Sequence, residues 1–411
     1  MSGEETREQT GRQTRPADTP ISALTAAVRA GIETDSQHGS VVPPLYMSTN
    51  YAFEGFDRKR TFDYSRSGNP TRALLGDALA TLEGGAGAIV TGTGTGAMTC
   101  VVTVLLDPGD LLLFPHDCYG GSWRLFESLA EKKHFETGTV DFTDAESAAA
   151  TVRERRPKVV WLETPSNPLL RISDIAAVAA AAHEVGAHVV VDNTFLTPLL
   201  QRPIELGADI VVHSTTKYIN GHSDVVGGAI VSATPELHEQ IDFWSNVLGV
   251  TGGAFDAYQT LRGLRSVHTR LRTHEENAAA VAELFASHPA VARTYYPGLP
   301  DHPGHELATI QQGGFGGMVS ADLVGGVPAV RAFVEGLRCF SLAESLGGTE
   351  SLVDHPTTMT HLAMTPEARA EAGISDGLLR FSIGIEHVSD LVADLTAALD
   401  RAAAATRARV A

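Results

Sequence analysis

An acid and a lysine that follow two short apolar runs form the strongest chemical signal in the sequence. Asp192 comes directly after Val189–Val191, and Lys217 comes soon after Ile210–Val212. Short runs of β-branched residues bounded by polar turns predict strands that are buried on both faces. In open parallel sheets, ligands bind at the carboxyl ends of the strands. We therefore predict that Asp192 and Lys217 share one site.

The chemistry that needs this pair is that of an aldehyde cofactor. A lysine amine forms a Schiff base with an aldehyde such as pyridoxal 5'-phosphate (PLP). The PLP ring acts as an electron sink while its nitrogen is protonated, and a buried acid beside that nitrogen keeps it so. The hydroxyl groups of Ser214 and Thr216 are then placed to bind the cofactor phosphate. The alternative at this point is a helix-capping Asp192 and a solvated Lys217.

A glycine-rich turn supplies a second candidate for phosphate binding. The segment Thr91–Gly96 (TGTGTG) separates a predicted strand, Ala88–Val90, from an apolar helix that is expected to begin at Ala97. Such a turn exposes backbone N–H groups at the positive end of a helix, which favours a phosphate. A dinucleotide is the rival ligand, but glycines at 92, 94 and 96 do not match the G-x-G-x-x-G spacing.

Two further residues have the chemistry of a binding site. Tyr119 follows the predicted strand Leu111–Phe114, where its ring could stack on a flat cofactor or serve only as a turn aromatic. Arg380 lies within the apolar strand signal Leu378–Ile383. A buried arginine needs an anionic partner, which is either an acid of this chain or the carboxylate of a substrate.

The elements that must position these residues fall into two parts. Strand and helix signals alternate over residues 69–232, with one helix opened by Asn69-Pro70 and another capped by Ser173. This pattern predicts a mostly parallel sheet with helices on both faces. A long helical pattern over residues 255–285 and later strand signals predict a smaller α+β domain. The predicted division is a disordered tail (1–20), an arm that contacts a neighbouring subunit (21–68), a large domain (69–265) and a small domain (266–411).

Composition excludes several classes of function. The net charge of −18 argues against a surface for nucleic acid or anionic lipid. No apolar run approaches the length of about 18 residues that a membrane helix needs, and the N-terminus lacks the apolar core of a signal peptide. Three widely spaced cysteines form neither a disulfide framework nor a metal-binding pattern. These features predict a cytoplasmic protein without a metal site.

Several long motifs together resemble one enzyme family. Over residues 24–400 the chain resembles the PLP-dependent enzymes of cysteine and methionine metabolism, which have the fold-type I, aspartate-aminotransferase-like architecture. The motifs that carry the resemblance are Asp63–Arg72 (DYSRSGNPTR), Val191–Phe195 (VDNTF), Ser214–Tyr218 (STTKY), Asn220–Asp224 (NGHSD), Ala343–Gly348 (AESLGG) and Arg380–Gly384 (RFSIG).

The resemblance implies a role for each matched cofactor residue. Lys217 forms the Schiff base and moves protons, Asp192 pairs with the pyridinium nitrogen, and Tyr119 stacks on the ring and helps to deprotonate the incoming amine. The residues expected to bind the phosphate are Gly94, Thr95, Ser214 and Thr216, joined by Tyr64 and Arg66 from a neighbouring subunit. A complete site therefore implies an oligomer, and the family implies a homotetramer. Relatives often have Met where Thr95 stands, which matters little if only its backbone is used.

The resemblance also implies the substrate contacts. Asn167, Ser345 and Arg380 are expected to hold the α-carboxylate of an amino-acid substrate. Glu344 is similar to an acid near the distal amino group of cystathionine, and Arg124 is expected to face an acyl leaving group. Some similar bacterial enzymes have a second arginine where this chain has Ser67, so the identity of the acyl group stays open.

Two runs narrow the resemblance to a subfamily. Pro115–Phe126 and Gly249–Asp256 look most like bacterial cystathionine γ-synthases. This implies γ-replacement, in which an O-acylhomoserine (succinyl or acetyl) and L-cysteine give L-cystathionine and a carboxylate. The alternatives are cystathionine γ-lyase, then an O-acylhomoserine sulfhydrylase or methionine γ-lyase, and, from another class, a non-catalytic PLP-binding protein. A nicotinamide-dependent dehydrogenase fits poorly, because it leaves Lys217 without a purpose.

Overall fold

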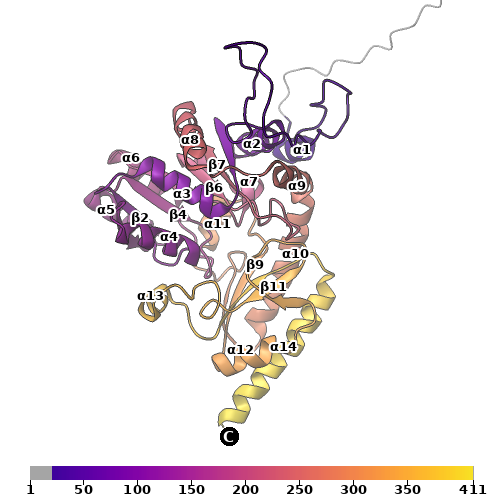
Figure 1. Ribbon diagram of the computed structural model, residues 1–411. Coiled ribbons are helices and arrows are strands. Elements are labelled where there is room, and N and C mark those ends of the chain that lie inside the picture. Colours follow the sequence, from indigo (N-terminus) through magenta and orange to yellow (C-terminus); the bar gives the residue numbers. More distant parts are fainter. Residues whose placement is uncertain (1–20, 411) are drawn as a thin grey trace, which may run out of the picture.

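The computed structural model describes residues 21–410, so the tail predicted to be disordered lies outside the described residues. The chain forms a seven-stranded sheet and a five-stranded sheet. Figure 1 shows them in two parts of the molecule, with the later part of the chain and the C-terminal helix below the first sheet. The predicted fold class is confirmed, whereas the domain boundaries stay predictions.

The large sheet is parallel except for one strand. Its order is β1-β7-β6-β5-β4-β2-β3, and β7 runs antiparallel to both of its neighbours. The carboxyl ends of the other strands therefore meet at one edge. The strands are β1 (Gly87–Thr91), β2 (Leu111–Pro115), β3 (Glu136–Val140), β4 (Val159–Glu163), β5 (His188–Asp192), β6 (Ile210–His213) and β7 (Gly228–Ser232).

Helices cover both faces of this sheet, as predicted. In β5, Val189 and Val191 belong to one apolar cluster, and Val190 belongs to another cluster on the opposite face. This alternation explains why the strand reads as a continuous apolar run. The helical elements of this part are α2 (Pro70–Glu83), α3 (Gly94–Leu105), α4 (Gly120–Glu131), α5 (Ala145–Arg155), α6 (Ile175–Glu184), α7 (Thr197–Leu200), the 3-10 turn η1 (Pro203–Leu206), α8 (Pro235–Leu248) and α9 (Ala254–Leu264).

Capping residues set the helix ends, and two of the observed ends differ from the predictions. Asn69 caps α2 as expected, because its side chain accepts hydrogen bonds from the first turn. Helix α3 begins at Gly94 rather than Ala97, since Thr93 accepts a hydrogen bond from the N–H of Gly96 at 2.7 Å. The cap of α6 is Asp174, one residue after Ser173. The segment predicted to be an arm contains a short helix, α1 (Ala23–Arg29).

The second sheet has the mixed topology of an α+β unit. Its order is β10-β11-β12-β9-β8, and only β10 and β11 are parallel. Its strands are β8 (Val291–Tyr295), β9 (Met318–Leu323), β10 (Phe340–Leu342), β11 (Ser351–Asp354) and β12 (Leu378–Ser382). Its helices are α11 (His305–Gln311), α12 (Val327–Val334), α13 (Pro366–Ala372) and α14 (Val388–Val410).

Helix α10 (Val267–Ser287) joins the two parts of the molecule. Its residues Val267 and Leu271 pack in a core cluster of the large sheet, whereas Ala278 and Phe285 pack in the core of the small sheet. The helical pattern predicted over residues 255–285 is divided between α9, which ends at Leu264, and α10. Across residues 21–410, none of the helices is sufficiently long and apolar to cross a membrane.

Candidate active site

A cavity of about 450 Å³ lies where the carboxyl ends of the parallel strands face the second sheet. Its walls come from β4, β5 and β6, from the start of α3 and from the segment that follows β10. Eleven of the predicted site residues line it: Gly94, Thr95, Tyr119, Asn167, Asp192, Ser214, Thr216, Lys217, Glu344, Ser345 and Arg380. The structure thus brings together residues that are far apart in the sequence.

Lys217 is one of the residues that line this cavity. Its Nζ atom is 2.8 Å from Oγ of Ser345. Burial, and next the positive charge of Arg380, lower the pKa of Lys217 from 10.5 to about 8. About a tenth of the amine is therefore neutral at pH 7, and the neutral amine is the form that attacks an aldehyde and accepts a proton.

Ser345 is brought to the lysine by a tightly packed turn. Its backbone has a positive φ of 83°, which is uncommon for a residue other than glycine. Two residues later, Gly347 also has a positive φ, and a Cβ atom there would lie 2.6 Å from the backbone N of Tyr218. Only glycine allows the turn to pass this close to the Lys217 backbone.

Asp192 lies at the end of β5, beside Glu163 at the end of β4. One carboxylate oxygen of Asp192 accepts a hydrogen bond from the N–H of Thr194 at 3.0 Å. Burial raises the pKa of Asp192 above its ordinary value. A cation in the cavity would stabilise the charged form of this acid. The position therefore fits a protonated ring nitrogen.

One end of the cavity suits a phosphate. Helices leave their first N–H groups without acceptors, and here the first residues of α3, Gly94 and Thr95, line the cavity. A Cβ atom on Gly94 would come within 2.8 Å of Cβ of Ser214, so glycine keeps this approach open. The hydroxyl of Thr216 bonds to the backbone of Gly227, donating at 3.1 Å and accepting at 3.0 Å.

A second group of residues in the cavity suits a carboxylate. Arg380 donates to Oδ1 of Asn167 at 2.9 Å and to the carbonyl of Ser345 at 3.1 Å, and it lies 3.6 Å from Asp354. Arg380 thus has an internal acid as a partner, and because its side chain also lines the cavity it can bind a substrate carboxylate as well. Its Nε atom is buried and has no hydrogen-bond acceptor in the described part of the chain.

Tyr119 separates the main cavity from a smaller one of about 370 Å³, which Arg124 and Glu344 also line. Burial raises the pKa of the Tyr119 phenol above its usual value. The phenol is therefore protonated near neutral pH, and the lowered pKa of Lys217 makes the lysine the better proton acceptor. The geometry leaves room for Tyr119 to stack on a ring, but its role as a base stays a prediction.

The pair predicted to act from a neighbouring subunit lies outside the cavity of its own chain. Tyr64 is 46% exposed. Arg66 donates to the carbonyl and the side-chain oxygen of Asn246 at 2.7 and 2.8 Å, and its guanidinium lies 5.7 Å from the centre of the Tyr64 ring. A role of this pair in a second subunit remains a prediction.

Sequence reasoning missed one buried acid of the cavity, Glu163. It is 5% exposed and lines the same wall as Asp192. Burial, and next the neighbouring Asp192, raise its pKa well above the ordinary value. A signal for it exists in the sequence, because Glu163 follows the apolar run of β4 as Asp192 follows that of β5.

Comparisons with known proteins agree with this geometry. Residues 24–400 match the family described as Cys/Met metabolism PLP-dependent enzyme. The chain belongs to this family. Its members depend on PLP, and the residues of the cavity fit that cofactor: an amine for the aldehyde, a buried acid for the ring nitrogen, and a helix N-terminus with hydroxyl groups for the phosphate.

Individual relatives are similar over nearly the whole chain. Cystathionine gamma-synthase of Escherichia coli is 54% identical over 371 residues, which cover 90% of this chain and 96% of the relative. The crystal structure of cystathionine gamma synthase from Xanthomonas oryzae pv. oryzae in complex with aminoacrylate and cysteine is 61% identical, with a TM-score of 0.93, covering 94% of this chain and 100% of that one. Cystathionine gamma-lyase of Dictyostelium discoideum is 42% identical, covering 92% of this chain and 97% of the relative.

Proposed function

We propose that this protein is a PLP-dependent cystathionine γ-synthase that converts an O-acylhomoserine and L-cysteine to L-cystathionine and a carboxylate. The observation that carries the proposal is that Lys217 shares one cavity with Asp192 and contacts Ser345, whose carbonyl accepts from Arg380. The similarity to the synthases of E. coli and X. oryzae supports the choice of reaction.

The proposal assigns the work of binding to residues at the two ends of the cavity. Arg380 and Asn167, which are hydrogen-bonded to each other at 2.9 Å, together hold the substrate α-carboxylate. Gly94, Thr95 and Ser214 hold the cofactor phosphate. PLP supplies an aldehyde for the amino group and a ring that accepts the electron pair left when the Cα proton departs.

Lys217 moves the protons in this proposal. Its neutral amine accepts the Cα proton of the substrate, and a second proton leaves Cβ before the acyl group departs. Both positions regain a proton after the cysteine thiolate has added, while Oγ of Ser345 at 2.8 Å holds Nζ in position. The acyl group leaves from Cγ as a carboxylate. Arg124, which lines the adjoining cavity, would pair with the negative charge of this carboxylate. The Sγ atom of cysteine bonds to Cγ in its place, and Glu344 is available for the distal amino group.

A product assay tests the reaction. Purified protein is incubated with O-succinylhomoserine or O-acetylhomoserine, with and without L-cysteine, and the products are identified by mass spectrometry. Cystathionine as the main product in the presence of cysteine is the expected result. The Lys217→Ala variant should form none and should lack the visible absorbance of the Schiff base. Wild-type levels of cystathionine from that variant would contradict the role of Lys217.

The second candidate is cystathionine γ-lyase activity, favoured by the similarity to the Dictyostelium enzyme. A lyase would cleave cystathionine to cysteine, α-ketobutyrate and ammonia faster than it forms cystathionine. Sulfide in place of cysteine tests for a sulfhydrylase, and methionine tests for a methionine γ-lyase. Bound PLP with no turnover of any of these substrates would point to a non-catalytic binding protein.

We also infer a homotetramer made of two active dimers, in the cytoplasm. The support for an active dimer is that Tyr64 and Arg66 lie on the exposed arm, away from the cavity of their own chain. Size-exclusion chromatography with light scattering measures the assembly directly, and a monomer with full activity would contradict it.

A further inference from the structure

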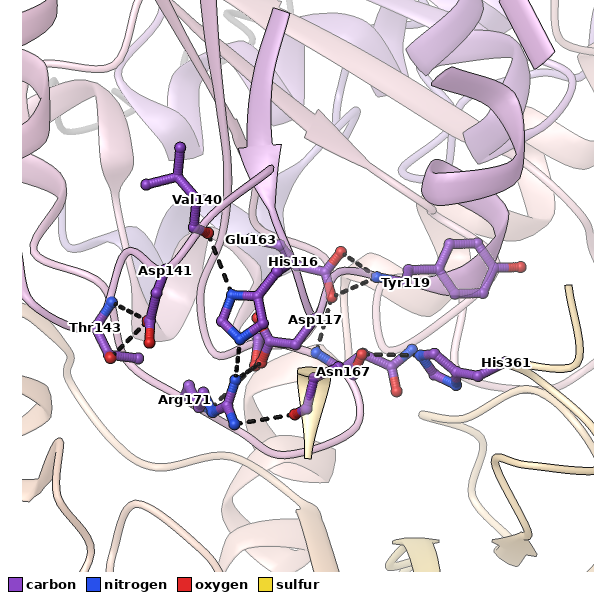
Figure 2. Close-up of polar contacts among 12 residues, drawn as sticks. His116, Asp117, Tyr119, Val140, Asp141, Thr143, Glu163, Asn167, Arg171 and His361 are labelled. Atoms are coloured by element: carbon purple, nitrogen blue, oxygen red, sulfur yellow. Dashed lines mark hydrogen bonds and ion pairs between the residues drawn. The ribbon is translucent and has the colours of Figure 1, made fainter. Parts of the chain in front are cut away.

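The side chain of Glu163 contacts the backbone of two separate loops at the cavity. Its Oε2 atom accepts from the N–H of Tyr119 at 2.9 Å, and its Oε1 atom accepts from the same N–H at 3.2 Å and from the N–H of Asn167 at 2.9 Å. Figure 2 shows the carboxylate between these two backbone groups. One side chain thus joins the loop after β2 to the loop after β4.

Both loops carry a residue of the cavity. Tyr119 is the residue before the first turn of α4, so the direction of its N–H is tied to the position of its ring. The side chain of Asn167 accepts from Arg380, and its backbone carbonyl lies 3.0 Å from Nε2 of His361. Asn167 is therefore held on three sides, and Glu163 provides the only one of these contacts that also reaches Tyr119.

Burying Glu163 beside a second acid costs free energy of folding. It lies one strand away from Asp192, in register with it; Glu163 is buried and Asp192 is partly buried. Two neighbouring buried carboxylates repel each other when both are charged, and an apolar residue of similar volume would avoid this cost. Hydrogen bonds from backbone N–H groups offset part of it and have a well-defined direction.

The same two loops have a separate connection on the outer side. Asp117 accepts from the hydroxyl of Ser166 at 2.5 Å and lies 3.4 Å from Arg171, whose Nη1 is 2.7 Å from His116. Figure 2 shows this cluster beside Glu163. None of these residues lines the cavity. The loops are therefore tied together without Glu163, which leaves the alignment of Tyr119 and Asn167 as its distinct contribution.

We propose that Glu163 is a positioning residue that sets the Tyr119 ring and the Asn167 amide in register on the two sides of the substrate. The expected effect on turnover rests on the proposed function, whereas the expected effect on the two loops does not. Tyr119 acts at the cofactor ring and Asn167 at the substrate carboxylate, so loss of Glu163 should affect kcat and KM together.

The variants Glu163→Gln and Glu163→Ala test the inference, with Glu83→Gln as the matched control. Glu83 is a fully buried glutamate at the C-terminal end of α2, and it bonds to Asn193 and His213 rather than to either loop. It therefore reports what neutralising a buried acid does to the protein in general. Gln at 163 keeps an acceptor for one oxygen but presents an amide donor at the other, whereas Ala removes all three contacts.

Hydrogen exchange followed by mass spectrometry provides a readout that needs neither cofactor nor substrate. In the cofactor-free protein, peptides that contain the amides of Tyr119 and Asn167 should exchange at least about tenfold faster in Glu163→Ala than in the wild type, with Glu163→Gln in between. Glu83→Gln should leave these peptides unchanged. No acceleration at the two loops, or an equal acceleration in Glu83→Gln, would overturn the inference.

Kinetics of the PLP-loaded enzyme separate this inference from the proposed function. If cystathionine is formed, Glu163→Ala should lower kcat and raise KM by at least about tenfold each, and Glu163→Gln should do so less. If the wild type forms no cystathionine, the proposed function fails while the exchange result still stands. Unchanged kcat and KM in Glu163→Ala, despite faster exchange, would refute the positioning role.

Discussion

The lowered pKa of Lys217 predicts how fast the cofactor-free protein captures PLP. At pH 7.5, a pKa of about 8 leaves about a quarter of the amine neutral, compared with about one part in a thousand for a lysine with the ordinary value of 10.5. Because only the neutral amine attacks the aldehyde, the capture rate should rise with pH and level off above about pH 8. An unperturbed lysine would still show a rising rate at pH 10.

Replacing Arg380 tests the electrostatic part of this shift. Arg380 is connected to Lys217 through Ser345, whose hydroxyl contacts Nζ at 2.8 Å and whose carbonyl accepts from the guanidinium at 3.1 Å. At this range and an effective dielectric constant of about 20, a unit charge changes the energy of the ammonium by ~1–2 kcal/mol, or about one pKa unit. Arg380→Gln should therefore raise the pKa to about 9 and lower the neutral fraction at pH 8 about fivefold.

The assay is the second-order rate of PLP capture at a series of pH values, followed by the visible absorbance of the Schiff base. Titration of PLP itself affects all variants equally, so a difference between variants in the pH midpoint of the capture rate reports a change in the pKa of Lys217. Arg380→Lys keeps the charge and should keep the midpoint near 8. Because Arg380→Gln leaves Asp354 buried without its cation, the Arg380→Gln/Asp354→Asn double variant is measured as a folding control. A wild-type midpoint near 10, or equal midpoints for Arg380→Gln and Arg380→Lys, would refute the reasoning.

Two further predictions concern assembly and packing. If Arg66 serves the neighbouring subunit, the inactive variants Arg66→Ala and Lys217→Ala should regain about a quarter of wild-type activity when refolded as a mixture, since half of the dimers are mixed and each has one intact site; no recovery would place Arg66 in its own chain's site. Gly347→Ala should lower the free energy of unfolding by ~2–4 kcal/mol and abolish PLP binding, because a methyl group would meet the Tyr218 backbone. Gly249→Ala, with a similar φ of 70° and open space around it, should cost only ~1 kcal/mol, as measured by thermal denaturation; equal losses would show that φ alone explains the effect.

Local patterns were sufficient to predict most of the large sheet and the residues at its edge. The apolar runs before Asp192 and Lys217 are strands because both of their faces are covered, which the sequence expresses as an absence of alternation. The start of α2 followed from Asn69 and Pro70, whose capping chemistry acts over only a few residues. The start of α3 was predicted three residues late because a glycine-rich segment usually indicates a loop, whereas the Thr93 side chain caps a helix that includes Gly94.

Contacts between distant segments could not be predicted from patterns. Arg380 on β12 meets Asn167, a partner 213 residues away in the sequence, and no periodicity in either segment indicates the other. Glu163 was overlooked because an acid after a single apolar run is common. Its importance depends on two backbone N–H groups, and every residue except proline carries one.

The order of charges along the cavity explains why one chain does not complete the site we propose. A PLP-bound amino acid carries a phosphate at one end, a cationic ring in the centre and a carboxylate at the other end. The cavity offers Asp192 at the centre and Arg380 at the carboxylate end, which match the second and third of these charges. At the phosphate end, the described residues that line the cavity provide backbone N–H groups and hydroxyls but no arginine or lysine beyond Lys217, whose amine is committed to the aldehyde. A dianion held only by neutral donors is poorly stabilised, so we predict that the additional positive charge comes from Arg66 of a neighbouring copy, the same residue that the mixing experiment tests.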